Sequence, residues 1–201
     1  MEKVLEFRGA EKIYHGGYLA LNAFDLTIKK TDGVFTVLGA VSSGKTTMTR
    51  LIAGLEYLSA GSMFLDGTRF DTLPVKRRNV CITGGVNTIK RSKTVRRNLC
   101  RSLFLRGADK AYAYKKAEEV ANMFGLPLDE RVGDEFAEKV IFARPFMREA
   151  DIYVFDDCAG LPNKIFDTLD GIVIITTDKP DAIAGKCAVI ADYTTIQNKI
   201  C

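Results

Sequence analysis

Histidine is almost absent from this chain of 201 residues, and cysteine is scarce and scattered. The one histidine is His15, and no two of the five cysteines form a C-x-x-C pair; they are Cys81, Cys100, Cys158, Cys187 and Cys201. A zinc cluster needs ligands at short, regular spacings, and a disulfide-built mini-protein needs a denser cysteine framework. Neither class is therefore expected, and we expect the thiols to be reduced.

Long apolar runs are also missing. The longest uninterrupted apolar runs are short, such as Ile172–Ile175. A membrane-spanning helix needs about 20 consecutive apolar residues. The first residues, Met1–Glu6, are too charged for a signal peptide. Glycine and proline are at ordinary levels, and a hydrophobic fraction of 47% can fill a core, so collagen and wholesale disorder are excluded. We expect one soluble, cytoplasmic domain over residues 1–201.

Acidic residues are absent between Asp71 and Asp109. This stretch carries ten basic residues: Lys76, Arg77, Arg78, Lys90, Arg91, Lys93, Arg96, Arg97, Arg101 and Arg106. The whole chain has a net charge of +4, so the remainder is net negative. Such a basic block either covers a solvated face or meets an anionic partner, such as an acidic protein, lipid head groups or nucleic acid.

Apolar periodicity predicts alternating strands and helices. The strands are expected at Val4–Phe7, Phe24–Ile28, Gly33–Leu38, Ser62–Leu65 with Thr68–Phe70 as a hairpin, Ile152–Phe155, Ile172–Thr176 and Ala188–Ala191. The helices are expected at Lys45–Ala53, Thr94–Leu105, Asp109–Phe124, Asp134–Arg148 (kinked or broken by Pro145), Asn163–Leu169 and Pro180–Ala184. This alternation indicates an α/β fold with a parallel sheet, into which the helical stretch from Thr94 is inserted as a lobe.

A phosphate-binding motif is complete in Gly39–Thr46, which fits G-x-x-x-x-G-K-S/T. Its glycines let backbone N–H groups surround an anion, and the following helix directs its positive end at phosphate. Lys45 is expected to reach the β- and γ-phosphates, and Thr46 to ligate Mg²⁺. The predicted nucleotide-contacting residues of this loop are Gly39, Ser42, Ser43, Gly44, Lys45, Thr46 and Thr47. The alternative interpretation, without nucleotide binding, is a glycine-rich strand-to-helix turn with an incidental lysine.

A hydrophobic strand ends in two carboxylates at Asp156 and Asp157. P-loop proteins need an acid on the strand beside the phosphate loop to hold Mg²⁺, and Asp156 fits this role. Asp157 then stands where a general base or water-orienting acid is needed. The alternative is that both aspartates cap the short helix expected at Asn163.

With these motifs, the chain resembles the ATP-binding subunits of ABC transporters, especially those of carbohydrate importers. The matching segments are Lys12–Tyr14, Leu19–Leu21, Gly39–Glu56, Ala60–Ser62, Asp66–Gly67, Thr72–Pro74, Thr94–Asn98, Ala143–Arg144 and the Asp156 strand. The resemblance implies a P-loop NTPase fold of the ABC ATPase type. It implies a mixed sheet core, an N-terminal antiparallel part and a helical lobe over about residues 88–148. It also implies ATP and Mg²⁺ as cofactors, with Tyr14 stacked on adenine.

Five positions depart from the family pattern. Gly85 replaces a glutamine that senses Mg²⁺, and Val132–Phe136 replaces the L-S-G-G-Q signature. Asp157 replaces the catalytic glutamate, Asn163 replaces an aspartate of the dimer-contact loop, and Thr177 replaces the histidine that grips the γ-phosphate. These departures affect cleavage and dimer closure, whereas the residues that hold ATP and Mg²⁺ remain. The C-terminal regulatory domain of carbohydrate-importer ATPases is not expected here, because the chain stops at Cys201.

The resemblance implies a subunit that binds Mg-ATP and hydrolyses it slowly or not at all, which leaves open whether it is an enzyme. Its expected partners are a transmembrane permease subunit and a second, competent ATP-binding subunit in a heterodimer, peripheral at the cytoplasmic face of the cell membrane. The basic block would then face the permease or its lipids. Nucleic acid is not an expected partner.

Two other classes stay open. A stand-alone GTPase or small-molecule kinase could use the same loop, and Asp157–Gly160 matches D-x-x-G, but no N-K-x-D for guanine is present. A nucleotide-independent scaffold of a transporter would keep the fold without binding ATP.

Overall fold

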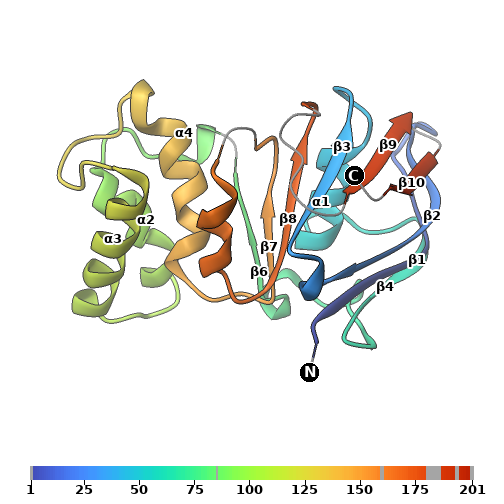
Figure 1. Ribbon diagram of the computed structural model, residues 1–201, viewed down its shortest axis with the longest axis horizontal. Coiled ribbons are helices and arrows are strands. Elements are labelled where there is room, and N and C mark those ends of the chain that lie inside the picture. Colours follow the sequence, from blue (N-terminus) through green and yellow to red (C-terminus); the bar gives the residue numbers. More distant parts are fainter. Residues whose placement is uncertain (1, 85, 159–160, 180–186, 193–194, 200–201) are drawn as a thin grey trace. The chain divides into compact units, whose positions relative to one another are not determined.

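The computed structural model describes residues 2–84, 86–158, 161–179, 187–192 and 195–199. The chain divides into two compact units, one of Met1–Ile82 with Ala150–Cys201 and one of Thr83–Glu149 (Figure 1). The second unit is therefore inserted between two segments of the first. Gly85 and the predicted helix at Pro180–Ala184 lie outside the described residues.

The first unit contains an antiparallel sheet in the order β2-β1-β4-β5. Its strands are β1 (Val4–Ile13), β2 (Leu19–Lys29), β4 (Ala60–Leu65) and β5 (Thr68–Arg69). The predicted hairpin of Ser62–Leu65 and Thr68–Phe70 is confirmed by β4 and β5. β1 and β2 are longer than predicted, because the register shifts after Phe7 break the alternation of buried and exposed residues from which the strands were inferred.

The second sheet of this unit has the order β10-β9-β3-β8-β7-β6. Its strands are β3 (Val34–Gly39), β6 (Val80–Ile82), β7 (Ile152–Phe155), β8 (Ile172–Thr177), β9 (Cys187–Asp192) and β10 (Thr195–Lys199). All neighbours are parallel except β9 and β10. The sheet is therefore mixed, as the resemblance implied. β10 was not predicted, since its sequence, TIQNK, carries little apolar signal.

The core of the first unit lies around helix α1 (Lys45–Ala53) and both sheets. Every residue of β7 and β8 is buried, which agrees with their unbroken apolar sequences. The α1 prediction is confirmed at both ends: the helix follows the loop after β3 and stops at Gly54, whose φ is 75°. Buried side chains of this core include Leu5, Phe7, Ile28, Val37, Met48, Ile52, Ile152 and Ile174.

Three α-helices form the second unit: α2 (Val95–Phe104), α3 (Lys110–Phe124) and α4 (Asp134–Ala143). The predicted starts of α2 and α3 are confirmed by their N-caps, since Thr94 accepts from the Arg97 N–H and Asp109 from the Ala111 and Tyr112 N–H groups. α4 ends at Ala143 and does not reach Arg148, because Pro145 lies in a separate 3₁₀ turn, η4 (Arg144–Met147).

Four further 3₁₀ turns are η1 (Lys30–Asp32), η2 (Val75–Arg77), η3 (Val86–Thr88) and η5 (Asn163–Thr168). The helix predicted at Asn163–Leu169 is thus a 3₁₀ turn. The expectation of reduced thiols is wrong in one place: Cys81, Cys100 and Cys158 are buried thiols, whereas Cys187 is disulfide-bonded. Across the described segments, none of the helices combines the length and apolar character needed to span a bilayer.

Candidate functional site

The loop between β3 and α1 turns through two left-handed residues. Ser42 has a φ of 64° and Gly44 a φ of 102°. Within the loop the Ser43 N–H donates to the Ala40 carbonyl at 3.2 Å, and the Met48 N–H starts the helical ladder on the Gly44 carbonyl at 2.9 Å. A left-handed non-glycine residue stores strain, and such strain concentrates at binding loops. The backbone therefore curls in front of the positive end of α1.

Gly44 of this loop cannot carry a side chain. A Cβ there would lie 2.5 Å from the Ala20 carbonyl oxygen and 2.7 Å from Cδ2 of Leu21. Real Cβ atoms do not approach other atoms so closely, and the backbone conformation itself favours glycine. Tertiary packing against β2 therefore requires the glycine that the motif contains.

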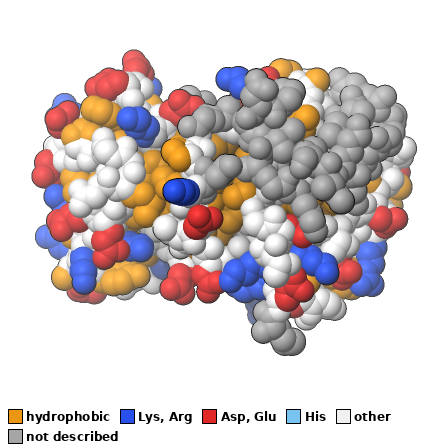
Figure 2. Space-filling model, in the orientation of Figure 1, with side chains coloured by type: hydrophobic (Ala, Val, Ile, Leu, Met, Phe, Trp, Pro, Cys, Tyr) orange, Lys and Arg blue, Asp and Glu red, His pale blue; other side chains and the backbone are white. Residues whose placement is uncertain are grey.

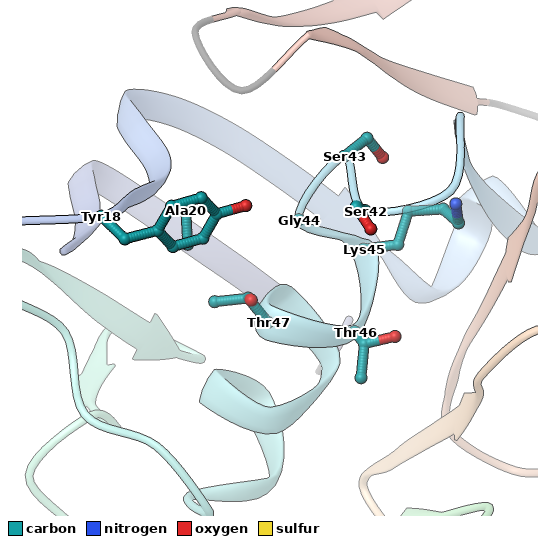
Figure 3. Close-up of a pocket in the computed structure, with 8 residues that line it drawn as sticks. All are labelled: Tyr18, Ala20, Ser42, Ser43, Gly44, Lys45, Thr46 and Thr47. Carbon is teal, nitrogen blue, oxygen red and sulfur yellow. The ribbon is translucent and has the colours of Figure 1, made fainter. Parts of the chain in front are cut away.

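The loop forms a cavity of about 190 Å³ (Figure 3). It is lined by Tyr18, Ala20, Ser42, Ser43, Gly44, Lys45, Thr46 and Thr47. Ser43 Oγ is buried and has no hydrogen-bond partner within the described residues. An unpaired buried hydroxyl costs about 1–3 kcal/mol, so a phosphate oxygen would satisfy it. The curled backbone, the glycine contact and this hydroxyl all fit a phosphate group.

Lys45 directs its ammonium back onto the start of the loop. Nζ donates to the Gly39 carbonyl at 2.6 Å and to the Ala40 carbonyl at 2.7 Å, and the residue is only 9% exposed. In Figure 3 the ammonium and the Tyr18 ring lie at opposite ends of the loop. No described carboxylate forms an ion pair with this buried ammonium, and the two carbonyls that accept its hydrogen bonds are neutral. It is therefore poised to bind an anion that enters the loop.

Asp156 and Asp157 are joined through Thr176 of the neighbouring strand β8. The Thr176 hydroxyl donates to Asp156 Oδ1 at 2.7 Å and accepts from the Asp157 N–H at 2.9 Å. Thr176 also pairs with Val37 of β3, two residues before the phosphate loop starts. The two carboxylates and the loop thus lie at the C-terminal ends of parallel strands in the same sheet. Thr176 was not predicted, because the sequence shows it only as part of an apolar strand.

A hydroxyl and one carboxylate suit Mg²⁺. This ion prefers oxygen ligands and usually retains several waters, so it needs few protein groups. Thr46 lines the cavity, and Asp156 is oriented by Thr176. No cluster of three or more histidine, cysteine or acidic ligands occurs within the described ranges. The donor set therefore fits Mg²⁺ better than a softer metal.

Two tyrosines lie at the open end of the loop. The Tyr14 hydroxyl lies 3.4 Å from Thr47 Oγ1, and the Tyr14 ring stacks on Tyr18 with centroids 6.4 Å apart and an interplanar angle of 27°. Tyr18 lines the cavity and is 51% exposed, whereas the predicted Tyr14 is not among the lining residues. The signal for Tyr18 is the Gly16–Gly17 turn, which pairs the Tyr14 N–H with the Tyr18 carbonyl at 2.8 Å.

The segment Val132–Phe136, at the signature position, forms the start of α4 in the second unit. Gly133 is the N-cap without a side-chain cap, and Asp134 and Glu135 occupy the first turn. Asp134 is 93% exposed and pairs with Arg91 at 2.7 Å. Two carboxylates at a helix N-terminus already compensate its positive end, which leaves little attraction for another anion.

The other two described departures have different outcomes. The Thr177 side chain is fully buried, and its hydroxyl accepts from the Lys179 N–H at 3.1 Å. Asn163 begins η5. The Thr177 hydroxyl therefore accepts a hydrogen bond from the backbone just after its own strand. The family pattern has an imidazole at this position.

A glycine-containing loop from a buried parallel strand to a helix, beside a strand that ends in carboxylates, defines a P-loop nucleotide-binding protein. Comparison with known families identifies the family of P-loop proteins to which the chain belongs. The chain matches the ABC transporter family over residues 21–160 and belongs to that family. The resemblance inferred from the motifs is thereby confirmed.

Similar curated proteins are ATP-binding proteins of import or transport systems. The chain is 30% identical over 159 residues to the sn-glycerol-3-phosphate import ATP-binding protein UgpC of Burkholderia thailandensis, covering 76% of this chain and 44% of that protein. The sulfoquinovosyl glycerol transport ATP-binding protein SmoE of Agrobacterium fabrum gives 30% identity over the same shares. The chain thus spans less than half the length of these relatives.

Solved structures of ABC cassettes show the same fold. The dimeric post-hydrolysis state of the ATP-binding cassette MJ0796 bound to ADP and Pi gives a TM-score of 0.80 at 20% identity, covering 98% of both chains. The cbiO1 protein from Clostridium perfringens, part of the ABC transporter complex cbiONQ, gives 0.83 at 17% identity, covering 100% of this chain and 89% of that one. The predicted P-loop NTPase fold of the ABC ATPase type is confirmed.

Proposed function

We propose that this chain is the ATP-binding subunit of an ABC importer and binds Mg-ATP at the loop Gly39–Thr46. The observation that carries the proposal is the loop itself, in which Gly44 admits no Cβ and Ser43 Oγ is a buried, unpartnered hydroxyl. Family membership supports ATP as the nucleotide. The names of UgpC, an import protein, and SmoE, a transport protein, support import of a carbohydrate-type or glycerol-based solute.

Each loop residue would have a defined task. Lys45 would exchange the Gly39 and Ala40 carbonyls for phosphate oxygens, which gives its buried ammonium a counter-charge. Ser42, Ser43 and Thr47 would line the phosphate chain, and Tyr14 or Tyr18 would contact the base. Thr46 and Asp156 would hold Mg²⁺, which supplies neutralisation of phosphate charge. Thr176 would keep the Asp156 carboxylate oriented.

We also propose that this chain hydrolyses ATP slowly or not at all. Asp157 is one methylene shorter than glutamate, which moves its carboxylate by about 1.5 Å, and displacements of this size can cost about 10²-fold in rate. Its backbone N–H is tied to Thr176, and its φ of 52° is left-handed. The backbone that carries this carboxylate is therefore held in place and is not free to advance by the missing length.

The expected partner is a second, competent ATP-binding subunit, together with a transmembrane permease at the cytoplasmic face of the membrane. In a homodimer both sites would face Asp134 and Glu135, and like charges repel a polyphosphate. A heterodimer would expose only one site to these carboxylates. Its other site could receive a complete signature segment from the partner.

Equilibrium binding of Mg-ATP to the purified chain tests the proposal. We expect binding that prefers ATP over GTP and that weakens at least tenfold in Lys45→Ala, since one charge-assisted contact contributes about 1.5–3 kcal/mol. Phosphate release should stay near the uncatalysed background. Tight GTP binding would favour a stand-alone P-loop enzyme. Absence of any binding up to millimolar ATP would favour a nucleotide-independent scaffold, and rapid phosphate release would contradict the proposal of weak hydrolysis.

A further inference from the structure

A second pocket lies wholly within the unit of residues 83–149 and contains none of the phosphate-loop residues. Its volume is about 570 Å³, which is within the range of sites for small organic molecules. Its charged lining residues are Lys90, Lys93, Arg97, Arg101 and Lys110, and no described acidic residue lines it. We refer to it as the basic pocket.

The five cations of the basic pocket differ from two other basic residues close to them in sequence. Arg91 pairs with Asp134, and Arg96 pairs with Glu118 and Asp129. By contrast, none of the five forms a salt bridge within the described part of the chain. Figure 2 shows acidic and basic side chains interspersed over the helical unit on the visible face. Other cations of this unit, such as Arg106, also form no salt bridge with a described residue, but these five are gathered around one pocket that no described acidic residue lines.

The positive field of this group extends to a neighbouring arginine. Arg97 and Arg101 are four residues apart on α2, so their guanidinium groups lie on one face of the helix. Burial, and to a smaller extent the charge of Arg101, lowers the pKa of Arg144. An anion bound between Arg97 and Arg101 would therefore meet two cations on one face of α2.

Apolar groups adjoin the cations. Phe104 is 41% exposed and Leu105 is 77% exposed, and both line the basic pocket. Tyr114 also lines it, with its ring centroid 6.4 Å from that of Phe104 and 5.3 Å from Lys110 Nζ. A ligand that fills this pocket would therefore combine a strongly anionic group with an apolar one.

We propose that the basic pocket binds a phosphate ester that carries an apolar group. A phosphate monoester holds about −1.5 to −2 charges at pH 7 and three acceptor oxygens in a small volume, whereas a carboxylate holds one charge. Two arginine forks from one helix face match phosphate oxygens in a bidentate manner. The apolar group would contact Phe104 and Leu105. The ligand could be a soluble phosphate ester or the head group of an anionic phospholipid.

The proposal is independent of nucleotide binding, so the test uses the full chain with Lys45→Ala, which disables the phosphate loop. One arm measures flotation with phosphatidylcholine vesicles that contain phosphatidic acid, against phosphatidylcholine alone. A second arm titrates soluble dihexanoyl phosphatidic acid below its micelle concentration. A third titrates an acidic leucine-containing hexapeptide. The variants are Arg97→Ala with Arg101→Ala, and the matched control is Arg106→Ala together with Arg91→Ala, which removes the same charge outside the basic pocket.

We expect phosphate-dependent binding that weakens at least tenfold in the Arg97 and Arg101 variant and less than threefold in the control. Binding to vesicles alone assigns a lipid surface, and binding of the short-chain ester as well admits a soluble ligand. Equal losses in variant and control would overturn the pocket as the site. Equal affinity for the acidic peptide would overturn the choice of phosphate, and absence of binding in both phosphate arms would overturn the whole proposal.

Discussion

Thr176 connects parts of the candidate nucleotide site that are far apart in the sequence. Its hydroxyl is shared between the Asp156 carboxylate and the Asp157 backbone, while its strand runs beside β3. A single buried side chain thus sets the position of the carboxylate assigned to Mg²⁺ and of the shortened acid beside it. Such a residue positions other groups without touching the substrate.

Thr176→Val is expected to lower both stability and Mg²⁺-dependent nucleotide binding. The Asp157 N–H would lose its acceptor, and an unpaired buried donor costs about 1–3 kcal/mol, which urea unfolding would measure. Affinity for Mg-ATP should fall by more than affinity for ATP without Mg²⁺, because Asp156 is released. Thr176→Ser keeps the hydroxyl and should retain Mg²⁺ dependence. Equal losses with and without Mg²⁺ would contradict a positioning role.

The helices of the second unit depend on local signals at their ends. Asp109 Oδ2 accepts from the Ala111 N–H at 2.8 Å and from the Tyr112 N–H at 3.1 Å, so it satisfies two exposed donors of α3.

Cys100 of α2 donates its Sγ–H to the Ala113 carbonyl at 3.3 Å, and burial raises the pKa of this thiol. Cys100 therefore packs as a neutral group between α2 and α3, which gives one cysteine a structural role.

Asp109→Ala is expected to destabilise α3 by about 1 kcal/mol, the usual cost of losing an N-cap. For a domain of this size, that corresponds to a loss of about 2–4 °C in Tm. Asp109→Asn keeps an accepting oxygen and should lose less. Thermal unfolding followed by circular dichroism would measure both variants. A Tm for Asp109→Ala at or above that of the unchanged chain would show that the cap contributes nothing.

Under the proposed function, association of this chain with an ATP-binding partner would depend on charge at α4 as well as on the phosphate loop. Asp134 and Glu135 place negative charge where the family uses neutral donors toward a partner's nucleotide.

Mg-ATP is therefore expected to leave the purified chain monomeric in sedimentation velocity. Neutralising the two acids with Asp134→Asn and Glu135→Gln should increase self-association in the presence of Mg-ATP. Lys116→Gln with Arg106→Gln serves as a control for the number of altered charges. A stable homodimer of the unchanged chain with Mg-ATP would contradict the heterodimer proposal.

The phosphate loop and α1 were predictable because they form one contiguous segment. A buried strand, a glycine-bearing turn and a lysine at the helix start are all visible in Gly33–Ala53, and the structure has the helix at the predicted bounds. The caps at Thr94 and Asp109 were equally local, so the starts of α2 and α3 followed from the sequence. Family membership rests on a match over residues 21–160, which contains these segments.

Features made by distant residues were not predictable in this way. Strand β10 forms through its pairing with β9 and carries little signal of its own. Tyr18 lines the cavity because a glycine turn aligns it with Tyr14, and Thr176 meets Asp156 only across two parallel strands. The sequence showed ten basic residues in one block, but only the fold separates ion-paired Arg91 and Arg96 from the group around Arg97. The physical reason is that backbone propensity is local, whereas contacts and charge compensation depend on which distant segments pack together.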